Sequence, residues 1–247
     1  MSLFMWTAGN AILPARECDM SGDTNGEPAP TWLDLYDWRL RMARFYQERD
    51  ETLRAGDDEQ TVLERFRAHK DHLFAMHPQS PLSPQGRQSF SGLSYFPYAP
   101  EMRVEATLVP IEDSEPVDQA GGGAMPLRLA ARVDFTLGGA LTHLPIYWID
   151  VYGGSLFLPF RDATCRDESY GGGRYLFDTA KGSTFEWIAP AALDPARAGY
   201  AGGRIVLDFN YAYNPSCAYD ARWLCPLARS ESTLPLPIRA GERKYAG

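Results

Sequence analysis

The sequence has no apolar run that approaches the ~18 uninterrupted residues of a transmembrane helix. It has no positively charged N-terminal region, and Glu17 before Cys18 is wrong for a signal-peptide cleavage site. Basic residues are in the minority, with 24 Lys and Arg against 32 Asp and Glu and a net charge of −8. This balance argues against a protein that follows nucleic-acid phosphates or docks on an anionic membrane. We therefore expect a cytoplasmic protein with no nucleic-acid and no membrane partner.

Motifs for cofactors and metals are also missing. Neither the Rossmann nor the P-loop glycine pattern occurs. The four cysteines form no Cys-x-x-Cys pair, and no histidine follows His143, so a local zinc site would need distant ligands. We expect no cofactor and no metal, and free thiols in a reducing compartment.

What the chain does contain is an ordinary globular core, with 45% hydrophobic and 13% aromatic residues over 247 positions. Residues 1–30 lack a sustained period and predict a flexible tail. Residues 31–78 predict a helical hairpin, because Thr31 and Asp34 form a capping-box pattern and Pro78 ends the second helix. Residues 79–247 predict an antiparallel β domain.

From Phe90 the apolar period changes to two, which is typical of strands. The clearest strand covers 127–137, with Val133 and its period-two neighbours facing inward, and paired glycines follow it as in tight hairpins. The other predicted strands cover 90–96, 102–109, 140–152, 155–160, 174–177, 184–188 and 204–209. We expect the 174–177 and 184–188 segments to pair as a hairpin and the tail from Asn214 to wrap the surface without regular structure. The fold class is then mainly β with N-terminal α: an antiparallel β-sandwich or barrel with a two-helix N-terminal hairpin.

Between Leu156 and Glu242, Asp, Asn, Arg, Tyr and Cys are dense among apolar residues. A buried polar group costs about 1–3 kcal/mol unless it finds a partner. This stretch therefore predicts either a satisfied polar network or a functional site.

Three residues of this stretch are candidate catalytic groups. Asp162 and Asp208 lie at strand ends and could act as acid and base if their environments differ. Cys217 is a candidate nucleophile. Other roles are to pin its loop with Cys225, as two buried or bridged thiols, or to bind a metal with it.

Substrate-binding candidates surround these groups. Arg174 follows three glycines that could cradle an anion, although a hairpin turn or bulge needs the same glycines. The tyrosines could wall a pocket or simply pack in the core. The predicted set is Thr164, Tyr170, Arg174, Tyr175, Asn210, Tyr213, Asn214 and Tyr219.

Motifs in this stretch are shared with a known family. They are Pro-Phe-Arg-Asp-Ala-Thr, Tyr-Gly-Gly-Gly-Arg-Tyr-Leu, Leu-Asp-Phe-Asn, Cys-Ala-Tyr, Cys-Pro-Leu and Ala-Gly-Glu. The chain resembles DUF1684, a bacterial family of domains of unknown function, over roughly residues 31–243. The resemblance implies no activity. Two departures stand out: Cys165-Arg166 where the family has Asn or Ser followed by Gly, and Arg229-Ser230 where it has prolines.

Two functions remain open. The first is a small-molecule enzyme that uses carboxylate acid–base chemistry in a tyrosine-lined pocket, with Arg174 anchoring an anionic ligand. The second is a non-catalytic ligand-binding or interaction module whose polar residues form a structural network. In the sharpest form of the site hypothesis, Asp162, Arg174, Asp208 and Asn210 converge on one cavity.

Overall fold

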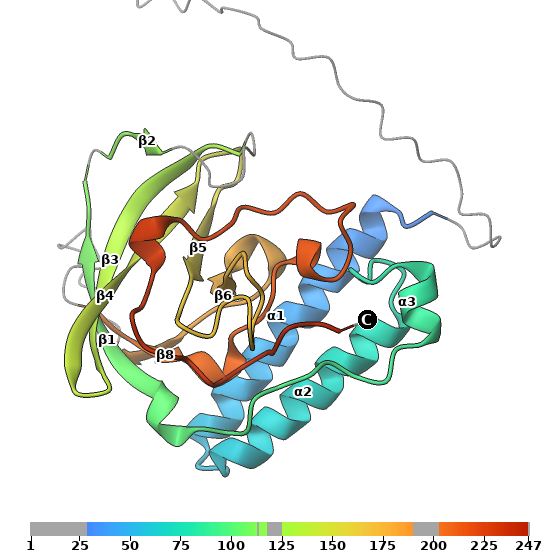
Figure 1. Ribbon diagram of the computed structural model, residues 1–247, viewed down its shortest axis with the longest axis horizontal. Helices are drawn as coiled ribbons and strands as arrows, with labels where there is room; N and C mark the ends of the chain where they lie inside the picture. The colour runs from blue at the N-terminus through green and yellow to red at the C-terminus, as the bar shows by residue number, and fades with distance from the viewer. Residues whose placement is uncertain (1–28, 113, 118–124, 190–202, 247) are drawn as a thin grey trace, which may run out of the picture.

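The computed structural model describes residues 29–112, 114–117, 125–189 and 203–246. A curled half-barrel of antiparallel strands lies on one side of the molecule and two long helices lie on the other (Figure 1). The C-terminal segment, drawn in orange and red, runs from the sheet across to the helices. The tail predicted for residues 1–30 falls almost wholly outside the described residues.

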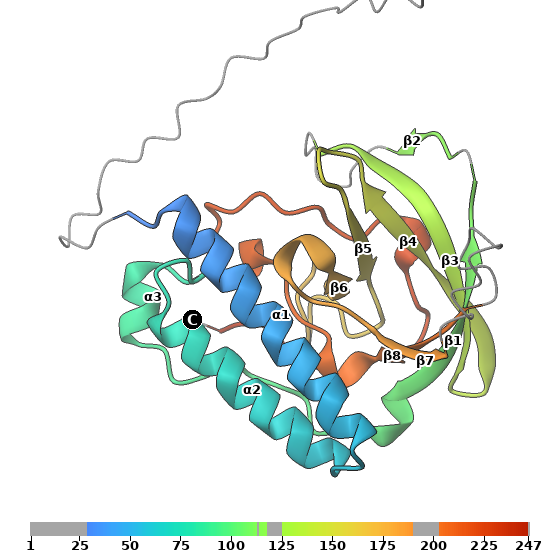
Figure 2. The same ribbon diagram turned by 180° about the vertical axis from the view of Figure 1, so that it is seen from behind.

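The helical hairpin consists of α1 (Trp32–Arg54) and α2 (Glu59–Met76), which lie side by side (Figure 2). The predicted capping box is confirmed: the Asp34 amide donates to Thr31 Oγ1 at 3.2 Å, and the Thr31 amide donates back to Asp34 Oδ2 at 2.6 Å. Aromatic contacts tie the hairpin to the β domain, because Phe66 of α2 meets Tyr211 edge-on with ring centroids 4.9 Å apart. No helix among the described residues is both long and apolar enough to cross a bilayer.

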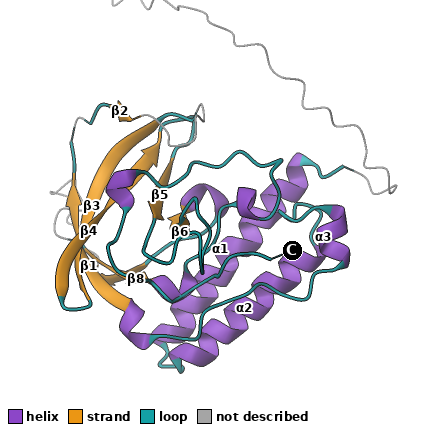
Figure 3. Cartoon of the chain, in the orientation of Figure 1, coloured by secondary structure: helices purple, strands orange, loops and turns teal. Residues whose placement is uncertain are grey.

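The sheet runs in the order β6-β5-β4-β3-β1-β8-β7, with β2 paired to β3 and every pairing antiparallel. Figure 3 sets it against the helices and the loop-rich C-terminal segment. The strands are β1 (Arg103–Pro110), β2 (Pro116–Val117), β3 (Leu127–Leu137), β4 (Ala140–Ile149), β5 (Ser155–Phe160), β6 (Arg174–Asp178), β7 (Glu186–Ala189) and β8 (Arg204–Asp208). The predicted mainly β class with an N-terminal helical hairpin is therefore confirmed, in the form of a half-barrel.

The turn between β3 and β4 shows why local prediction works here. Gly138 and Gly139 have φ angles of +58° and +79°, as a type I′ hairpin turn requires at both central positions. That turn sets the pairing of Val133 opposite Leu144, both without exposed surface in the main core. A register shift between Leu129 and Ala131 leaves those two residues only half-buried, against the expected burial of the whole face.

Two strand predictions are wrong. Residues 90–96 form no strand; Tyr95 makes only an isolated bridge to Glu242. β6 and β7 do not pair, because they occupy opposite edges of the sheet and β7 pairs with β8 instead. The half-barrel curls enough for a short connection to join the two edges, where Phe177 and Phe185 bring their ring centroids to 4.8 Å.

The C-terminal segment is irregular as predicted, with only the short 3-10 turns η4 (Ser216–Ala218) and η5 (Ser230–Ser232) after Asn214. It does more than wrap the surface. Leu234, Ile238 and Ala240 belong to the same apolar core as the sheet and are essentially inaccessible. Polar residues of this segment are buried with them, and their partners decide where a site can lie.

Candidate functional site

Asp162 and Arg174 form a buried ion pair, with Arg174 Nη2 2.8 Å from Asp162 Oδ2. The guanidinium also donates to the carbonyls of Ile238 at 2.7 Å, Ala240 at 2.5 Å and Glu242 at 3.0 Å. Arg174 has no exposed surface. Of its nitrogens, only Nε is without a partner. The pair therefore fastens the C-terminal segment to β6.

Aromatic rings close the remaining faces of this guanidinium. Arg174 Cζ lies 5.1 Å from the ring centroid of Phe160 and 5.6 Å from that of Phe96. Neither Arg174 nor Asp162 lines either of the two larger cavities described below. This geometry argues against Arg174 as an anion anchor and fits the mutual satisfaction of two buried charges.

Asp162 orders the loop after β5 through its other oxygen. Asp162 Oδ1 accepts from the Thr164 amide at 2.7 Å and from the Ile238 amide at 3.2 Å. The Thr164 hydroxyl in turn donates to Ser169 Oγ at 2.8 Å, and both hydroxyls are buried. Every polar contact of Thr164 is thus to the protein, which is a folding role and leaves no group for a substrate.

Asp208 and Asn210 lie together at the end of β8, away from that pair in the hydrogen-bond network. Asn210 clamps the backbone of Ala99, accepting from its amide and donating to its carbonyl, both at 2.9 Å. Its own amide and Nδ2 both donate to Asp208 Oδ1 at 2.9 Å. The four residues expected to converge on one cavity therefore form two pairs, Asp162 with Arg174 and Asp208 with Asn210.

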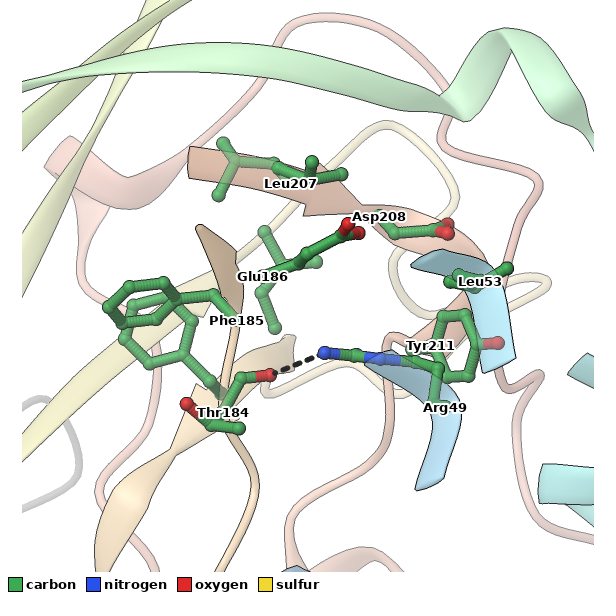
Figure 4. Close-up of a pocket in the computed structure, with 11 residues that line it drawn as sticks. Arg49, Leu53, Thr184, Phe185, Glu186, Leu207, Asp208 and Tyr211 are labelled. Carbon is green, nitrogen blue, oxygen red and sulfur yellow. Dashed lines mark hydrogen bonds between the residues drawn. The ribbon is translucent and has the colours of Figure 1, made fainter. Parts of the chain in front are cut away.

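One side of Asp208 faces a cavity of about 360 Å³, which we call the Asp208 cavity (Figure 4). In Figure 4, Arg49 reaches from α1 across this cavity toward the Thr184 carbonyl, 3.5 Å from its Nη2. Burial raises the pKa of the Asp208 carboxyl above its ordinary value, although the hydrogen bonds from Asn210 work in the opposite direction. The remaining lining residues are Leu53, Leu176, Phe177, Phe185, Glu186, Val206, Leu207 and Tyr211.

Arg103 links the two carboxylates of this cavity. Its Nη2 lies 2.6 Å from Glu186 Oε2, and its Nε lies 3.7 Å from Asp208 Oδ2. Antiparallel pairing of β1 with β8 places Arg103 directly opposite Asp208. Asp208 Oδ2 therefore has a guanidinium near it, at a distance beyond a hydrogen bond.

A second cavity of about 420 Å³ lies between the helical hairpin and the C-terminal segment, and we call it the Lys70 cavity. Three predicted residues line it: Tyr213, Asn214 and Tyr219. Lys70 of α2 and Lys181 of η2 (Thr179–Lys181) bring two ammonium groups to its wall. The rest of the lining is Trp38, Met42, Phe74, Pro81, Ser183 and Ser216.

The carboxylate of Glu242 accepts hydrogen bonds from three groups beside this cavity. It accepts from Lys70 Nζ at 2.6 Å, from the Asn214 amide at 2.8 Å and from the Tyr219 hydroxyl. Lys70 and Glu242 are only 5% and 1% exposed, so this ion pair is nearly dry. Among the described residues the side-chain Oδ1 of Asn214 has no hydrogen-bond partner. The Lys70 cavity thus has a buried cation and an unfilled acceptor in its surroundings.

The other two predicted tyrosines line neither of these cavities. Tyr175 is fully buried, donates its hydroxyl to the Pro226 carbonyl and meets Phe157 edge-on at 4.7 Å. Tyr170 lies with its hydroxyl 3.6 Å from Cys217 Sγ. Burial raises the pKa of Tyr170 to about 12, so it stays protonated at neutral pH.

The thiols of Cys217 and Cys225 are free and close together, since the Cys217 amide donates to Cys225 Sγ at 3.3 Å. The Cys217 thiol donates to the Cys225 sulfur as well, which lowers the pKa of Cys225 to about 6. The pKa of Cys217 is raised by the same contact and by burial. No cluster of three metal-ligating side chains occurs among the described residues.

Comparison with known proteins identifies the family. The sequence profile of the protein family of unknown function DUF1684 matches residues 88–243, well over half of the chain. The chain belongs to the DUF1684 family. No curated protein matches it. A similar solved structure is the solution NMR structure of an uncharacterized protein from Haloarcula marismortui, 36% identical, covering 78% of this chain and 97% of its own, with a TM-score of 0.54.

This match is broader than the family profile, because residues 88–243 make up less than two thirds of the chain. The structural similarity therefore includes residues outside that range. The DUF1684 resemblance drawn from sequence motifs is confirmed. It carries no activity with it, since both the family and the structural neighbour are uncharacterised.

One departure from the DUF1684 pattern now has a structural meaning. Arg166 stands where the resemblance to the family predicts glycine, and its φ angle is +81°, the one positive value among the described non-glycine residues. Its amide donates to the Ser169 carbonyl at 3.0 Å, which closes the loop after Thr164. A side chain in this left-handed region costs about 1–2 kcal/mol relative to glycine. Arg166 therefore adopts the left-handed conformation at this energetic cost.

Sequence reasoning missed Arg49, Lys70, Lys181 and Glu242. A signal for Lys70 was available: it lies one helical turn from both Phe66 and Phe74, on the apolar face of α2. A charged side chain on the buried, apolar face of a helix needs a buried partner of opposite charge. The partner, Glu242, lies 172 positions away, and no local pattern points to it.

Proposed function

We propose that this protein binds a small anionic molecule in the Lys70 cavity. The observation that carries the proposal is the state of the Lys70 ammonium group. Within the described part of the chain it donates one hydrogen bond, to Glu242, and otherwise lies over the Tyr213 and Phe74 rings, at 4.7 and 5.6 Å. An ammonium has three donors, and a buried ammonium with unfilled donors on a cavity wall favours an acceptor-rich ligand.

A second cation strengthens the preference for an anion. Lys181 lines the same cavity, and its nearest carboxylate oxygen, on Asp178, is 3.8 Å from Nζ. At that distance the ion pair leaves the ammonium free to donate to a ligand. Lys70 is already neutralised by Glu242, so Lys181 supplies the charge that a ligand would balance.

Aromatic walls favour a ligand with a planar body. Trp38, Phe74, Tyr213 and Tyr219 line the cavity, and most small-molecule sites combine such apolar walls with a few polar groups. A one-ring acid with a hydroxyl or N–H group matches these features.

Calorimetric titration of the full chain with 4-hydroxybenzoate tests the proposal, with 4-hydroxybenzamide as the neutral isostere. We expect saturable one-site binding of the acid and about tenfold weaker binding of the amide, because a charge-assisted hydrogen bond is lost. Lys181→Met should weaken binding of the acid by a similar factor. Lys244→Met, which removes an exposed lysine outside the cavity, is the matched control. Equal affinity for both compounds, or indifference to Lys181→Met, would refute the anion site.

A second candidate function is acid–base catalysis in the Asp208 cavity. It is favoured by one observation: a carboxyl whose pKa is raised by burial sits beside Glu186, with Arg49 across the cavity. A carboxyl shifted toward neutrality can donate or accept a proton near physiological pH more readily than an ordinary one. In this function Arg49, and not Arg174, would meet an anionic group of the substrate.

A further inference from the structure

Cys217 and Cys225 lie eight positions apart on the C-terminal segment, across the loop that follows η4. The Cys217 amide points at Cys225 Sγ from 3.3 Å, and the Cys217 thiol donates to the same sulfur. Both residues are free thiols of intermediate exposure, so a small reagent can reach them. Both thiols are unbridged, and the amide of one residue lies within hydrogen-bonding distance of the sulfur of the other, outside every β-strand of the described chain.

The surroundings make the two thiols unequal. Cys225 Sγ accepts from the Cys217 thiol and from the Cys217 and Ser216 amides, and the Lys181 ammonium is near, so its pKa falls to about 6. The pKa of Cys217 moves upward, and the Tyr170 hydroxyl lies 3.6 Å from its sulfur. At neutral pH the pair therefore shares one proton, held by Cys217, and Cys225 is the thiolate. A thiolate beside a protonated thiol is the arrangement of an attacking and a resolving cysteine.

We propose that Cys217 and Cys225 form a redox-active dithiol that reduces hydrogen peroxide and closes to a disulfide. The Cys225 thiolate attacks one peroxide oxygen, the O–O bond breaks, and the leaving hydroxide takes a proton from solvent to become water. Cys225 is then a sulfenic acid. The Cys217 sulfur attacks it, the S–O bond breaks as the S–S bond forms, and the Cys217 proton leaves with the hydroxyl as a second water. Two thiols are oxidised by two electrons and one peroxide is reduced.

A third thiol in the structure provides an internal control. Cys165 is also of intermediate exposure, but within the described residues its sulfur has only a long contact, of 4.0 Å, with Ser169 Oγ and no hydrogen bond to a second thiol. The inference does not depend on a ligand in the Lys70 cavity. Failure of either proposal leaves the other standing.

The test is oxidation of the reduced full chain with one equivalent of hydrogen peroxide at pH 7, followed by iodoacetamide and tryptic peptide mapping. Trypsin cuts after Arg204, Arg222 and Arg229, which separates Cys217 from Cys225. We expect a disulfide-linked pair of peptides, 205–222 with 223–229, and alkylated Cys165. The rate should fall about tenfold from pH 7 to pH 5, because the thiolate fraction of a group with pKa about 6 falls by that factor.

Two variants assign the roles. Cys217→Ser should accumulate a sulfenic acid at Cys225 that dimedone traps, and Cys225→Ser should yield none at Cys217. The proposal is overturned if the linked peptides do not form, if Cys165 oxidises as fast as Cys225, or if the rate is the same at pH 5 and pH 7. The last two comparisons use the unmodified chain, so they hold even if a variant fails to fold.

Discussion

Arg174 Nη2 lies 2.8 Å from Asp162 Oδ2, and the same guanidinium holds the carbonyls of residues 238, 240 and 242. The bond therefore connects β6, the loop after β5 and the C-terminal segment at one point. Because both charges are buried, each depends on the other for its stability in the core.

Arg174→Met should destabilise the protein by about 3–5 kcal/mol, because it strands a buried Asp162 carboxylate and three carbonyls. Urea unfolding measures the change. Arg132→Met is the matched control, since Arg132 makes an exposed ion pair with Asp134 and should have no measurable effect. Removal of both charges, in Arg174→Met with Asp162→Asn, should cost less than the sum of the single changes. Additive costs would mean that the two side chains do not support each other.

Gly241→Ala should destabilise strongly, because a Cβ there would lie 2.5 Å from the Ala212 carbonyl oxygen and 2.7 Å from that of Phe209. Its φ of +75° adds a smaller cost. Gly153→Ala separates the two effects: it has a similar φ of +84° and nothing within 4 Å of the added carbon. The melting temperature of Gly241→Ala should be far lower than that of Gly153→Ala. Equal falls in melting temperature would show that the close approach of the Ala212 and Phe209 carbonyls is not the reason for glycine in the Ala-Gly-Glu motif.

Arg166→Gly should stabilise the protein by up to about 1 kcal/mol, since glycine takes a φ of +81° without strain. Part of the relief is offset by the greater freedom of glycine in the unfolded chain. Urea denaturation at pH 7 measures the gain, and Arg166→Ala, which keeps a Cβ in the same conformation, should show none. A loss of stability in Arg166→Gly would show that the arginine side chain contributes more than its backbone costs.

The raised pKa of Asp208 predicts a pH dependence of stability. Above the ordinary pKa of 3.8, the native state holds the Asp208 proton longer than the unfolded state, so the contribution of this group to stability declines as pH rises through the native pKa. Asp208→Asn keeps an acceptor for the two Asn210 donors and does not titrate. Its stability relative to wild type should therefore improve as pH is raised from 4 to 7, measured by urea unfolding at each pH. The pKa values of Asp71 and Asp178 are also raised. Both residues are present in wild type and in Asp208→Asn, so their effect cancels when the stabilities of these two proteins are subtracted. A difference that stays constant or moves the other way would rule out a raised Asp208 pKa.

Features set by neighbouring residues could be predicted from the sequence. The Thr31–Asp34 capping box and the Gly138-Gly139 turn follow from residue types at fixed spacing, and both are found in the structure. The partner of β7 could not be predicted in this way. The edge that each strand joins depends on the arrangement of the whole half-barrel, in which β7 pairs with β8 at the edge opposite β6.

For the polar residues too, local features could be predicted and long-range pairings could not. Their density predicted either a satisfied polar network or a functional site, and the Asp162–Arg174 pair is a part of such a network. The partner of each buried charge can lie far away in the sequence, so local patterns do not identify it. The Lys70–Glu242 pair joins a helix near the start of the chain to the last buried carboxylate of the described segment, and only the folded chain brings them together.

The dependence of Arg174 and Lys70 on residues 238–242 also orders events during synthesis. Lys70 leaves the ribosome long before Glu242, the carboxylate that neutralises it. Arg174 follows its own carboxylate, Asp162, but precedes the three carbonyls of residues 238, 240 and 242 to which it donates. Folding of the sheet and the helices should therefore remain incomplete until residues 238–242 emerge. A chain stalled before Ile238 would be a client for chaperones, even though every helix and strand had already been made.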